Sequence, residues 1–195
     1  MQSITAALVE ALWFILPAYF ANSIPVDVSK LRILEWMGKP IDGGRSWGGK
    51  RILGDGKTWR GLFSGIIAGT LVGVLQIQFQ GAMKESYPQL PEMTVGLAFM
   101  LSFGAIFGDM VASFFKRRIG MPRGEPAPLL DQLDFVFGAA FFAWIWSATA
   151  YGGPEGAFDR MIGYERFFLI VLVTPFFHLL GNGMAWVAKL KERPW

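Results

Sequence analysis

Five long runs of apolar residues divide this chain of 195 residues. They cover, approximately, residues 4–23, 61–80, 93–115, 135–151 and 164–188. An α-helix needs about 20 apolar residues to cross the hydrocarbon core of a bilayer, and the runs are close to that length. The charged residues gather between them, above all in segments 24–60 and 116–134. The pattern therefore predicts one all-α integral membrane domain, with five transmembrane helices and a large loop between the first two.

The overall composition supports a membrane protein and narrows the chemistry. Hydrophobic residues make up 53% of the chain and charged residues only 17%, which is unlike a soluble domain. The absence of cysteine excludes disulfides and thiolate metal sites, and one histidine, His178, is too few for a histidine-based zinc site. A metal would therefore have oxygen ligands. No nucleic-acid partner is predicted.

The cations are distributed unevenly between the two sides of the predicted bundle. Fifteen of the 18 lysines and arginines lie in segments 24–60, 116–134 and 189–195. The opposite side has only three, which are Lys84, Arg160 and Arg166. Because cytoplasmic loops are enriched in Lys and Arg, the N-terminus is predicted outside and the C-terminus in the cytoplasm. Both polar loops would then face the cytoplasm of a multi-pass protein in the cell membrane.

Ionisable residues at the end of the third run form a candidate site. Asp109, Ser113 and Lys116 are four and then three residues apart, so a helix would place them on one face. Asp109 would lie about 10 Å from the level of Lys116, inside the hydrocarbon edge. A carboxylate there is expected to be neutral, paired or metal-bound, because an isolated buried charge is too costly. Ionisable residues in such positions are usually functional.

A second pair of carboxylates follows a Pro- and Gly-rich elbow. Asp131 and Asp134 would share one face of the first turn of the next helix, where they repel each other unless a cation lies between them. Mg²⁺ with a polyphosphate suits this arrangement, since Mg²⁺ takes one or two carboxylates together with phosphate oxygens. Alternatively, Lys116, Arg117 and Arg118 are only a topology signal, and the two aspartates only favour a helix start. Asp109 favours the metal-site interpretation over this alternative, because a topology signal does not need an aspartate inside the span.

The loop before the second run carries a candidate phosphate-binding turn. Residues 54–58 read Gly-Asp-Gly-Lys-Thr, but Arg51 stands where a P-loop needs its first glycine, and no strand precedes it. What remains is a Gly-Lys-Thr turn at the N-terminus of a helix, where free amides and the helix dipole favour phosphate. Alternatively, the segment is a flexible basic loop on anionic lipid headgroups.

Small and polar residues inside the runs complete the pattern. Gly61, Gly65, Gly69 and Gly73 form a stripe that would let helices pack closely. Asn22 lies near the cytoplasmic end of the first run. Asn182 lies at about the depth of Asp109, and this matched depth suggests that Asn182 and Asp109 share one cavity. His178 is left out of the predicted site, because a lone histidine in a span more often packs than binds a ligand.

These motifs resemble a known family. Gly108-Asp109, Ser113-x-x-Lys116-Arg117 and Asp131-x-x-Asp134 resemble the signature of the integral-membrane cytidylyltransferases that make CDP-diacylglycerol. Together with residues 54–61 (Gly-Asp-Gly-Lys-Thr-Trp-Arg-Gly), they are most similar to the archaeal branch, the CDP-archaeol synthases. The likeness extends from Pro17-x-x-x-x-Asn22 to Asn182. Residues 123–128 differ from the bacterial Lys-Asp and Pro-Gly-His-Gly-Gly pattern, so bacterial substrate contacts cannot be transferred to the elbow.

The resemblance implies Mg²⁺-dependent transfer of CMP from CTP to an isoprenoid ether-lipid phosphate, which forms a CDP-archaeol-type lipid and pyrophosphate. The residues assigned to catalysis are Lys116, Arg117, Asp131 and Asp134. Those assigned to nucleotide binding are Asp55, Gly56, Lys57, Thr58, Arg60, Ser113 and Asn182. The metal ligands are Asp109, Asp131 and Asp134, and the lipid contact is Asn22.

Three alternatives to this function can be stated. The first is a cytidylyltransferase that uses phosphatidic acid. The second, a CDP-alcohol phosphotransferase, is disfavoured because its Asp-Gly-x-x-Ala-Arg motif is absent. The third is a polytopic transporter with a cationic cytoplasmic vestibule, for which repeated halves and broken helices would be expected.

Overall fold

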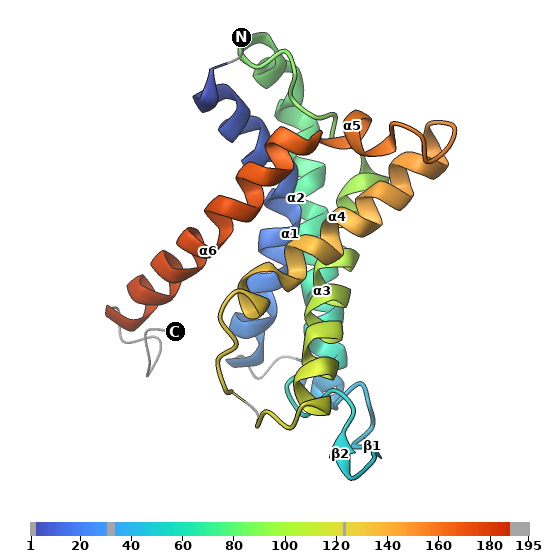
Figure 1. Ribbon diagram of the computed structural model, residues 1–195, viewed down its shortest axis with the longest axis vertical. Helices are drawn as coiled ribbons and strands as arrows, with labels where there is room; N and C mark the ends of the chain where they lie inside the picture. Colours follow the sequence, from blue (N-terminus) through green and yellow to red (C-terminus); the bar gives the residue numbers. More distant parts are fainter. Residues whose placement is uncertain (1–2, 31–33, 123, 188–195) are drawn as a thin grey trace.

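The computed structural model describes residues 3–30, 34–122 and 124–187, without the side chains of residues 27, 29, 30 and 181–187. Its elements in chain order are α1 (Ile4–Lys30), the 3₁₀ helix η1 (Glu35–Gly38), β1 (Ser46–Trp47), β2 (Lys50–Arg51), α2 (Trp59–Ser86), α3 (Val95–Arg118), α4 (Leu130–Ala150), α5 (Ala157–Met161) and α6 (Tyr164–Val187). The helices α1, α2 and α3 pack on one another, and α4 packs mainly on α3 (Figure 1). The antiparallel hairpin of β1 and β2 lies beyond the end of α3.

Within the described part of the chain, four helices are long and apolar enough to cross a membrane. They are residues Ile4–Val26 of α1, and the whole of α2, α3 and α4. A further C-terminal helix, α6, has 24 residues, which gives it a length of about 36 Å. The all-α membrane fold is thus confirmed with four candidate spans. The fifth span stays a prediction, and residue 188, its predicted end, lies outside the described residues.

The ends of several helices differ from those of the predicted hydrophobic runs. The first helix continues through Pro25 to Lys30, and α2 runs from Trp59 to Ser86 rather than from 61 to 80. Runs were bounded by hydrophobicity, whereas a helix continues as long as its hydrogen bonds do. The start of α3 is later than predicted because the Thr94 side chain caps it, accepting a hydrogen bond from the Leu97 N–H at 3.2 Å.

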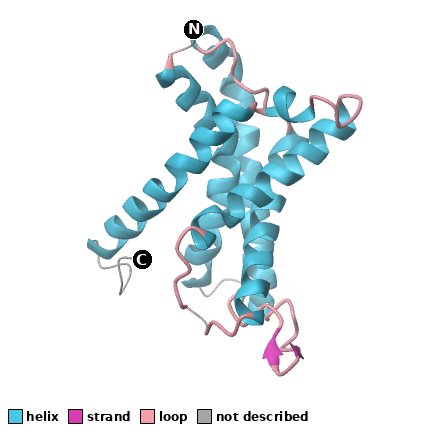
Figure 2. Cartoon of the chain, in the orientation of Figure 1, coloured by secondary structure: helices cyan, strands magenta, loops and turns pink. Residues whose placement is uncertain are grey.

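The predicted loop 24–60 is more ordered than expected. Besides the last turns of α1, it contains η1 and the hairpin, where Ser46 pairs with Arg51 and Trp47 with Lys50 (Figure 2). The tight turn of the hairpin uses Gly48 and Gly49, both with positive φ, which glycine adopts without strain. The short helix α5 was also not predicted.

Glycines bring the helices into close contact. A Cβ at Gly69 would lie 2.4 Å from the main-chain oxygen of Pro17 in α1, and one at Gly73 would lie 2.1 Å from the Cβ of Ala98 in α3. The predicted packing role of the stripe is therefore confirmed for Gly65, Gly69 and Gly73. Gly61 is different, because a Cβ there would make only ordinary contacts.

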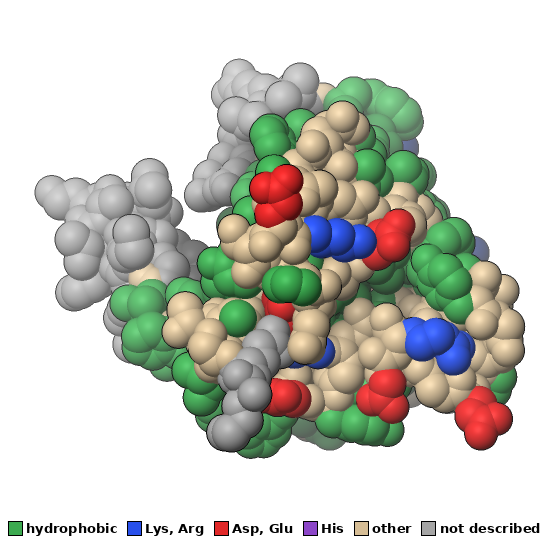
Figure 3. Space-filling view, turned by 90° about the horizontal axis from the view of Figure 1, so that it is seen from above, with side chains coloured by type: hydrophobic (Ala, Val, Ile, Leu, Met, Phe, Trp, Pro, Cys, Tyr) green, Lys and Arg blue, Asp and Glu red, His purple; other side chains and the backbone are tan. Residues whose placement is uncertain are grey.

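The two ends of the bundle differ in charge. The hairpin, residues 52–58 and the elbow before α4 lie together at one end, and the connections 87–94 and 151–163 lie at the other (Figure 1). On that second end, a few Lys and Arg side chains lie among Asp and Glu (Figure 3). The cation-rich loops that the sequence predicts on one side therefore do meet at one end.

A buried ion pair ties the other end together. Glu10, which is fully buried in α1, accepts a hydrogen bond from Arg166 of α6 at 2.7 Å, and Arg166 also donates to Gln89 before α3 at 2.6 Å. Further along the same two helices, Tyr19 and Thr174 are hydrogen-bonded at 2.8 Å. These contacts fasten α6 to α1.

Candidate active site

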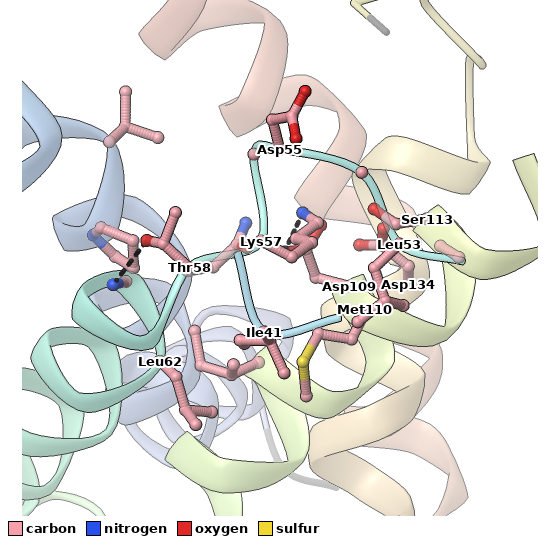
Figure 4. Close-up of a pocket in the computed structure, with 18 of the residues that line it drawn as sticks. Ile41, Leu53, Asp55, Lys57, Thr58, Leu62, Asp109, Met110, Ser113 and Asp134 are labelled. Atoms are coloured by element: carbon pink, nitrogen blue, oxygen red, sulfur yellow. Dashed lines mark hydrogen bonds and ion pairs between the residues drawn. The ribbon is translucent and has the colours of Figure 1, made fainter. Parts of the chain in front are cut away.

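A cavity of about 730 Å³ lies at the end of the bundle that carries the hairpin. Twelve of the thirteen predicted site residues line it: Asn22, Asp55, Gly56, Lys57, Thr58, Arg60, Asp109, Ser113, Lys116, Arg117, Asp131 and Asp134. Figure 4 shows Lys57, Asp109 and Asp134 facing this space. The thirteenth, Asn182, lies in α6, but its side chain is outside the described residues. The cavity is large enough for a small-molecule ligand.

The Gly-Lys-Thr turn is located at the start of a helix, as predicted. Thr58 is the N-cap of α2, and its side-chain oxygen accepts a hydrogen bond from the Gly61 N–H at 3.1 Å. Lys57 immediately precedes this cap. The first turn of α2 therefore offers N–H groups and the positive end of its dipole to the cavity.

Lys57 and Asp109 form an ion pair across the cavity, from the loop to α3. Lys57 Nζ lies 2.5 Å from Asp109 Oδ2, and the two side chains are 23% and 29% exposed. Asp109, Ser113 and Lys116 all line the cavity, as their spacing on one helical face predicts. The intramembrane carboxylate thus has a cationic partner 52 residues away in sequence.

A second ion pair joins α3 to the start of α4. Lys116 Nζ lies 2.7 Å from Asp131 Oδ1, while Asp131 Oδ2 accepts from the Ala127 N–H at 2.9 Å. Asp134, one turn later, accepts only a local bond from the Phe135 N–H among the hydrogen bonds of the described residues. Among the described residues, Asp134 therefore lacks the lysine partner that Asp131 has.

The main chains of α3 and α4 touch beside these carboxylates. A Cβ built on Gly108 would lie 2.2 Å from the main-chain oxygen of Asp134, closer than real Cβ atoms approach. Glycine at position 108 therefore allows α4 to bring Asp134 next to Asp109.

Gly108→Ala is expected to lower turnover about a hundred-fold, because a displacement of about 1 Å in a catalytic site has effects of that size. Overpacking should also reduce stability by about 1–3 kcal/mol. Turnover and thermal melting of purified protein in detergent would measure both effects. The matched control is Gly81→Ala in α2, where an added Cβ meets nothing within 4 Å. Wild-type turnover of Gly108→Ala would show that the close contact is not needed.

Asp42 organises the loop beside the cavity and was missed in the sequence. Its carboxylate accepts hydrogen bonds from Arg51 at 2.8 Å and from the N–H groups of Gly44, Leu53 and Gly54 at 3.0 Å each. Burial alone would raise the pKa of Asp42, but these hydrogen bonds outweigh it and hold the pKa below its usual range. Its stabilising contribution is therefore complete above the ordinary aspartate pKa and is lost as the pH falls below that range.

His178 also lines the cavity, from α6. The sequence interpretation left it out, since a lone histidine in an apolar helix more often packs than binds. In the structure, α6 reaches the cavity and brings this side chain among the lining residues.

A bundle of apolar helices with cations and carboxylates around one cavity at its polar end defines a membrane-embedded enzyme acting on phosphate compounds. The family model described as "CarS-like: CDP-archaeol synthase" matches residues 4–195. The chain belongs to the CDP-archaeol synthase family.

Similar proteins support this assignment over nearly the full length. CDP-archaeol synthase of Thermococcus onnurineus is 45% identical over 97% of this chain and 98% of its own. That of Halobacterium salinarum is 39% identical over all of both chains. A solved structure described as "an intramembrane enzyme for archaeal membrane lipids biosynthesis" matches with a TM-score of 0.63 and 35% identity, over 90% of this chain and 94% of that one.

The family settles the class and reaction that the sequence predicts. Its members are nucleotidyltransferases that carry out CTP-dependent cytidylyl transfer to an archaeal ether-lipid phosphate, so the predicted family, enzyme class and reaction are confirmed. A multi-pass membrane location is confirmed as well.

Proposed function

We propose that CTP and the lipid phosphate meet in the charged cavity, and that CMP is transferred there. The observation that carries this proposal is the convergence of cations and carboxylates from four separate segments on one space. Lys57 and Arg60 come from the loop and α2, Lys116 from α3, and Asp134 from α4. Two highly charged substrates that repel each other require this mixture of groups.

The cations are proposed to bind the phosphates of CTP. Lys57 and Lys116 each have a carboxylate partner in this structure, so binding a triphosphate would exchange those partners for phosphate oxygens. Arg60 and Arg117 line the same cavity and would complete the clamp. Asp55, Gly56, Thr58 and Ser113 are proposed to contact the nucleotide beside them, and Asn182 remains a proposed contact from α6.

Asp109 and Asp134 fit a magnesium ion. They face one cavity from adjacent helices, and Mg²⁺ needs only one or two carboxylates when phosphate oxygens supply further ligands. Among the described residues, no three carboxylate or histidine side chains form a metal site by themselves. Bound Mg²⁺ would polarise the α-phosphate and neutralise the pyrophosphate. Asp131, predicted as the third ligand, is paired with Lys116 in this structure, and we propose that it positions that lysine.

The acceptor is proposed to be the archaeal ether-lipid phosphate. Its phosphate oxygen is already anionic at neutral pH, so the enzyme has to orient it and screen its charge rather than remove a proton. Asn22 of α1 lines the cavity and would contact this headgroup, and the lining also includes the apolar side chains of Leu62 and Ile106. The hydrocarbon chains would stay in the bilayer.

The cavity is proposed to face the cytoplasm, where CTP and Mg²⁺ are available. The cation-rich connections lie at its end of the bundle, as the positive-inside rule requires for a cytoplasmic side. The N-terminus would then be outside, and α6 would form the fifth span.

The proposal is tested by measuring pyrophosphate release from purified protein with CTP and either an ether-lipid phosphate or phosphatidic acid. We expect release that requires the lipid, prefers the ether lipid, and falls to background when EDTA removes Mg²⁺ and returns when Mg²⁺ is added back. Release that survives complete removal of divalent ions would contradict the metal site. Equal rates with both lipids would contradict the proposed acceptor.

A further inference from the structure

A network of hydrogen bonds outside the cavity fastens the hairpin to α3. Arg118, the last residue of α3, donates from Nη1 to the main-chain oxygen of Trp47 at 2.6 Å, and from Nη2 to those of Lys50 and Arg51 at 2.9 and 2.6 Å. Lys50 Nζ returns a bond to the main-chain oxygen of Arg118 at 2.9 Å. One guanidinium thus holds three carbonyls of the hairpin.

Aromatic rings fix the orientation of this guanidinium. Its carbon lies 5.5 Å from the centre of the Trp47 ring and 5.3 Å from that of Phe114. Cation–π contacts of this length are favourable. Arg118 does not line the cavity. Although it belongs to the basic run after the third span, its contacts are those of a structural clasp rather than of a phosphate ligand.

The clasp is continuous with the wall of the cavity. Arg51, whose carbonyl Arg118 holds, bonds through its own guanidinium to Asp42 at 2.8 Å and to Asp55 at 2.6 Å. Asp42, with a side chain only 1% exposed, in turn binds the N–H groups of Leu53 and Gly54. Leu53, Gly54 and Asp55 all line the cavity.

The same segment sets the place of Lys57. The Ile41 N–H donates to the main-chain oxygen of Lys57 at 2.8 Å, and the Trp59 N–H to that of Lys39 at 3.2 Å. Residues 39–42 therefore run beside residues 53–59, and Asp42 closes one end of this pairing. Together, the carboxylate of Asp42 and the guanidinium of Arg118 fix the position of the loop relative to the face of α3 that carries Asp109.

We propose that Asp42 and Arg118 are positioning residues for CTP: they touch no substrate, but they hold the loop of residues 53–57 in its binding shape against α3. This proposal rests on the cavity being the CTP site. A loop ordered in advance loses little freedom on binding, whereas a loosened loop must be ordered at the expense of affinity. The lipid phosphate, which reaches the cavity from the helices, should be much less affected.

The test separates the two substrates in Asp42→Asn and Arg118→Lys. Asparagine has nearly the shape of aspartate but lacks the charge that four donors require, and lysine keeps the charge of arginine but lacks its planar fork. We expect the KM for CTP to rise about ten-fold or more in Asp42→Asn and several-fold in Arg118→Lys, where ten-fold corresponds to about 1.4 kcal/mol. The KM for the lipid should stay within about two-fold of wild type, since these residues lie outside the helical part of the cavity.

The matched control is Arg160→Lys. Arg160 also clasps a connection, donating to the main-chain oxygens of Glu155 and Gly153 at 2.6 and 2.7 Å, but at the opposite end of the bundle. Its KM for CTP should not change. Direct titration of CTP binding to the folded fraction would repeat the comparison without measuring turnover. If either variant folds poorly, Lys50→Met replaces it in the test, because it removes only the bond from Lys50 Nζ to the main-chain oxygen of Arg118.

Two results would overturn the proposal. One is a loss of folded protein with unchanged affinity for CTP, which would make the clasp merely structural. The other is an equal rise of both KM values, which would show a general distortion of the cavity. The first result does not depend on the catalytic proposal: absence of lipid-dependent turnover in wild-type protein would overturn that proposal, while the CTP titration could still be carried out.

Discussion

Asp134→Asn should abolish cytidylyl transfer, lowering turnover about a thousand-fold, which is the size of effect that a preorganised charge in a catalytic site can have. Asp134 faces the cavity from the first turns of α4, beside Asp109 of α3. Asparagine keeps the side-chain oxygen that accepts from the Phe135 N–H at 2.6 Å, so the fold should persist while the negative charge is lost. Lipid-dependent pyrophosphate release at saturating CTP measures the effect.

The control for this substitution is Asp159→Asn, which removes an aspartate from α5 at the other end of the bundle. It should leave turnover within about two-fold of wild type, because substitutions away from special contacts have small effects. The melting temperatures of both variants should match that of wild type. If Asp134→Asn retained most of its turnover, Asp134 would have to be removed from the proposed machinery, and Asp109 and Asp131 would be the remaining candidates.

The sequence could predict four of the spans and the charged residues that line the cavity, because these depend on local patterns. Hydrophobic runs near 20 residues identify helices, and the spacing of Asp109, Ser113 and Lys116 places them on one face whatever the rest of the chain does. The Gly-Lys-Thr turn was located correctly for the same reason, since Thr58 is a good N-cap next to a hydrophobic run. Helix ends were less accurate, because helical hydrogen bonding continues past the apolar run.

Pairings between distant segments could not be predicted. Lys57 was assigned to phosphate and Asp109 to metal, but no local pattern shows that they meet each other across 52 residues. Asp42 stands in an Asp-Gly-Gly turn, a local signal that indicates a bend but not its four donors. In the same way, the run from Lys116 to Arg118 looks uniform in sequence, and only tertiary structure separates Arg118, which clasps the hairpin, from Lys116, which lines the cavity.

The second large effect is expected far from the cavity. Glu10→Gln should lower the free energy of unfolding by about 3–5 kcal/mol, because it leaves the charge of Arg166 without its buried partner. Glu10 is fully buried, its ion pair with Arg166 is 2.7 Å long, and the Arg166 side chain is only 15% exposed. Water can therefore do little to replace the lost carboxylate. Thermal or denaturant unfolding in detergent would measure the loss.

Two further variants separate the ion pair from other causes. Glu92→Gln breaks the exposed pair with Lys84, in which the atoms are 3.6 Å apart and the side chains are 66% and 38% exposed. It should cost less than about 1 kcal/mol. The double variant Glu10→Gln with Arg166→Gln should recover part of the loss, since both charges of the buried pair are then removed. If Glu10→Gln were as mild as Glu92→Gln, the packing of α1 on α6, rather than the ion pair, would be what holds that end of the bundle together.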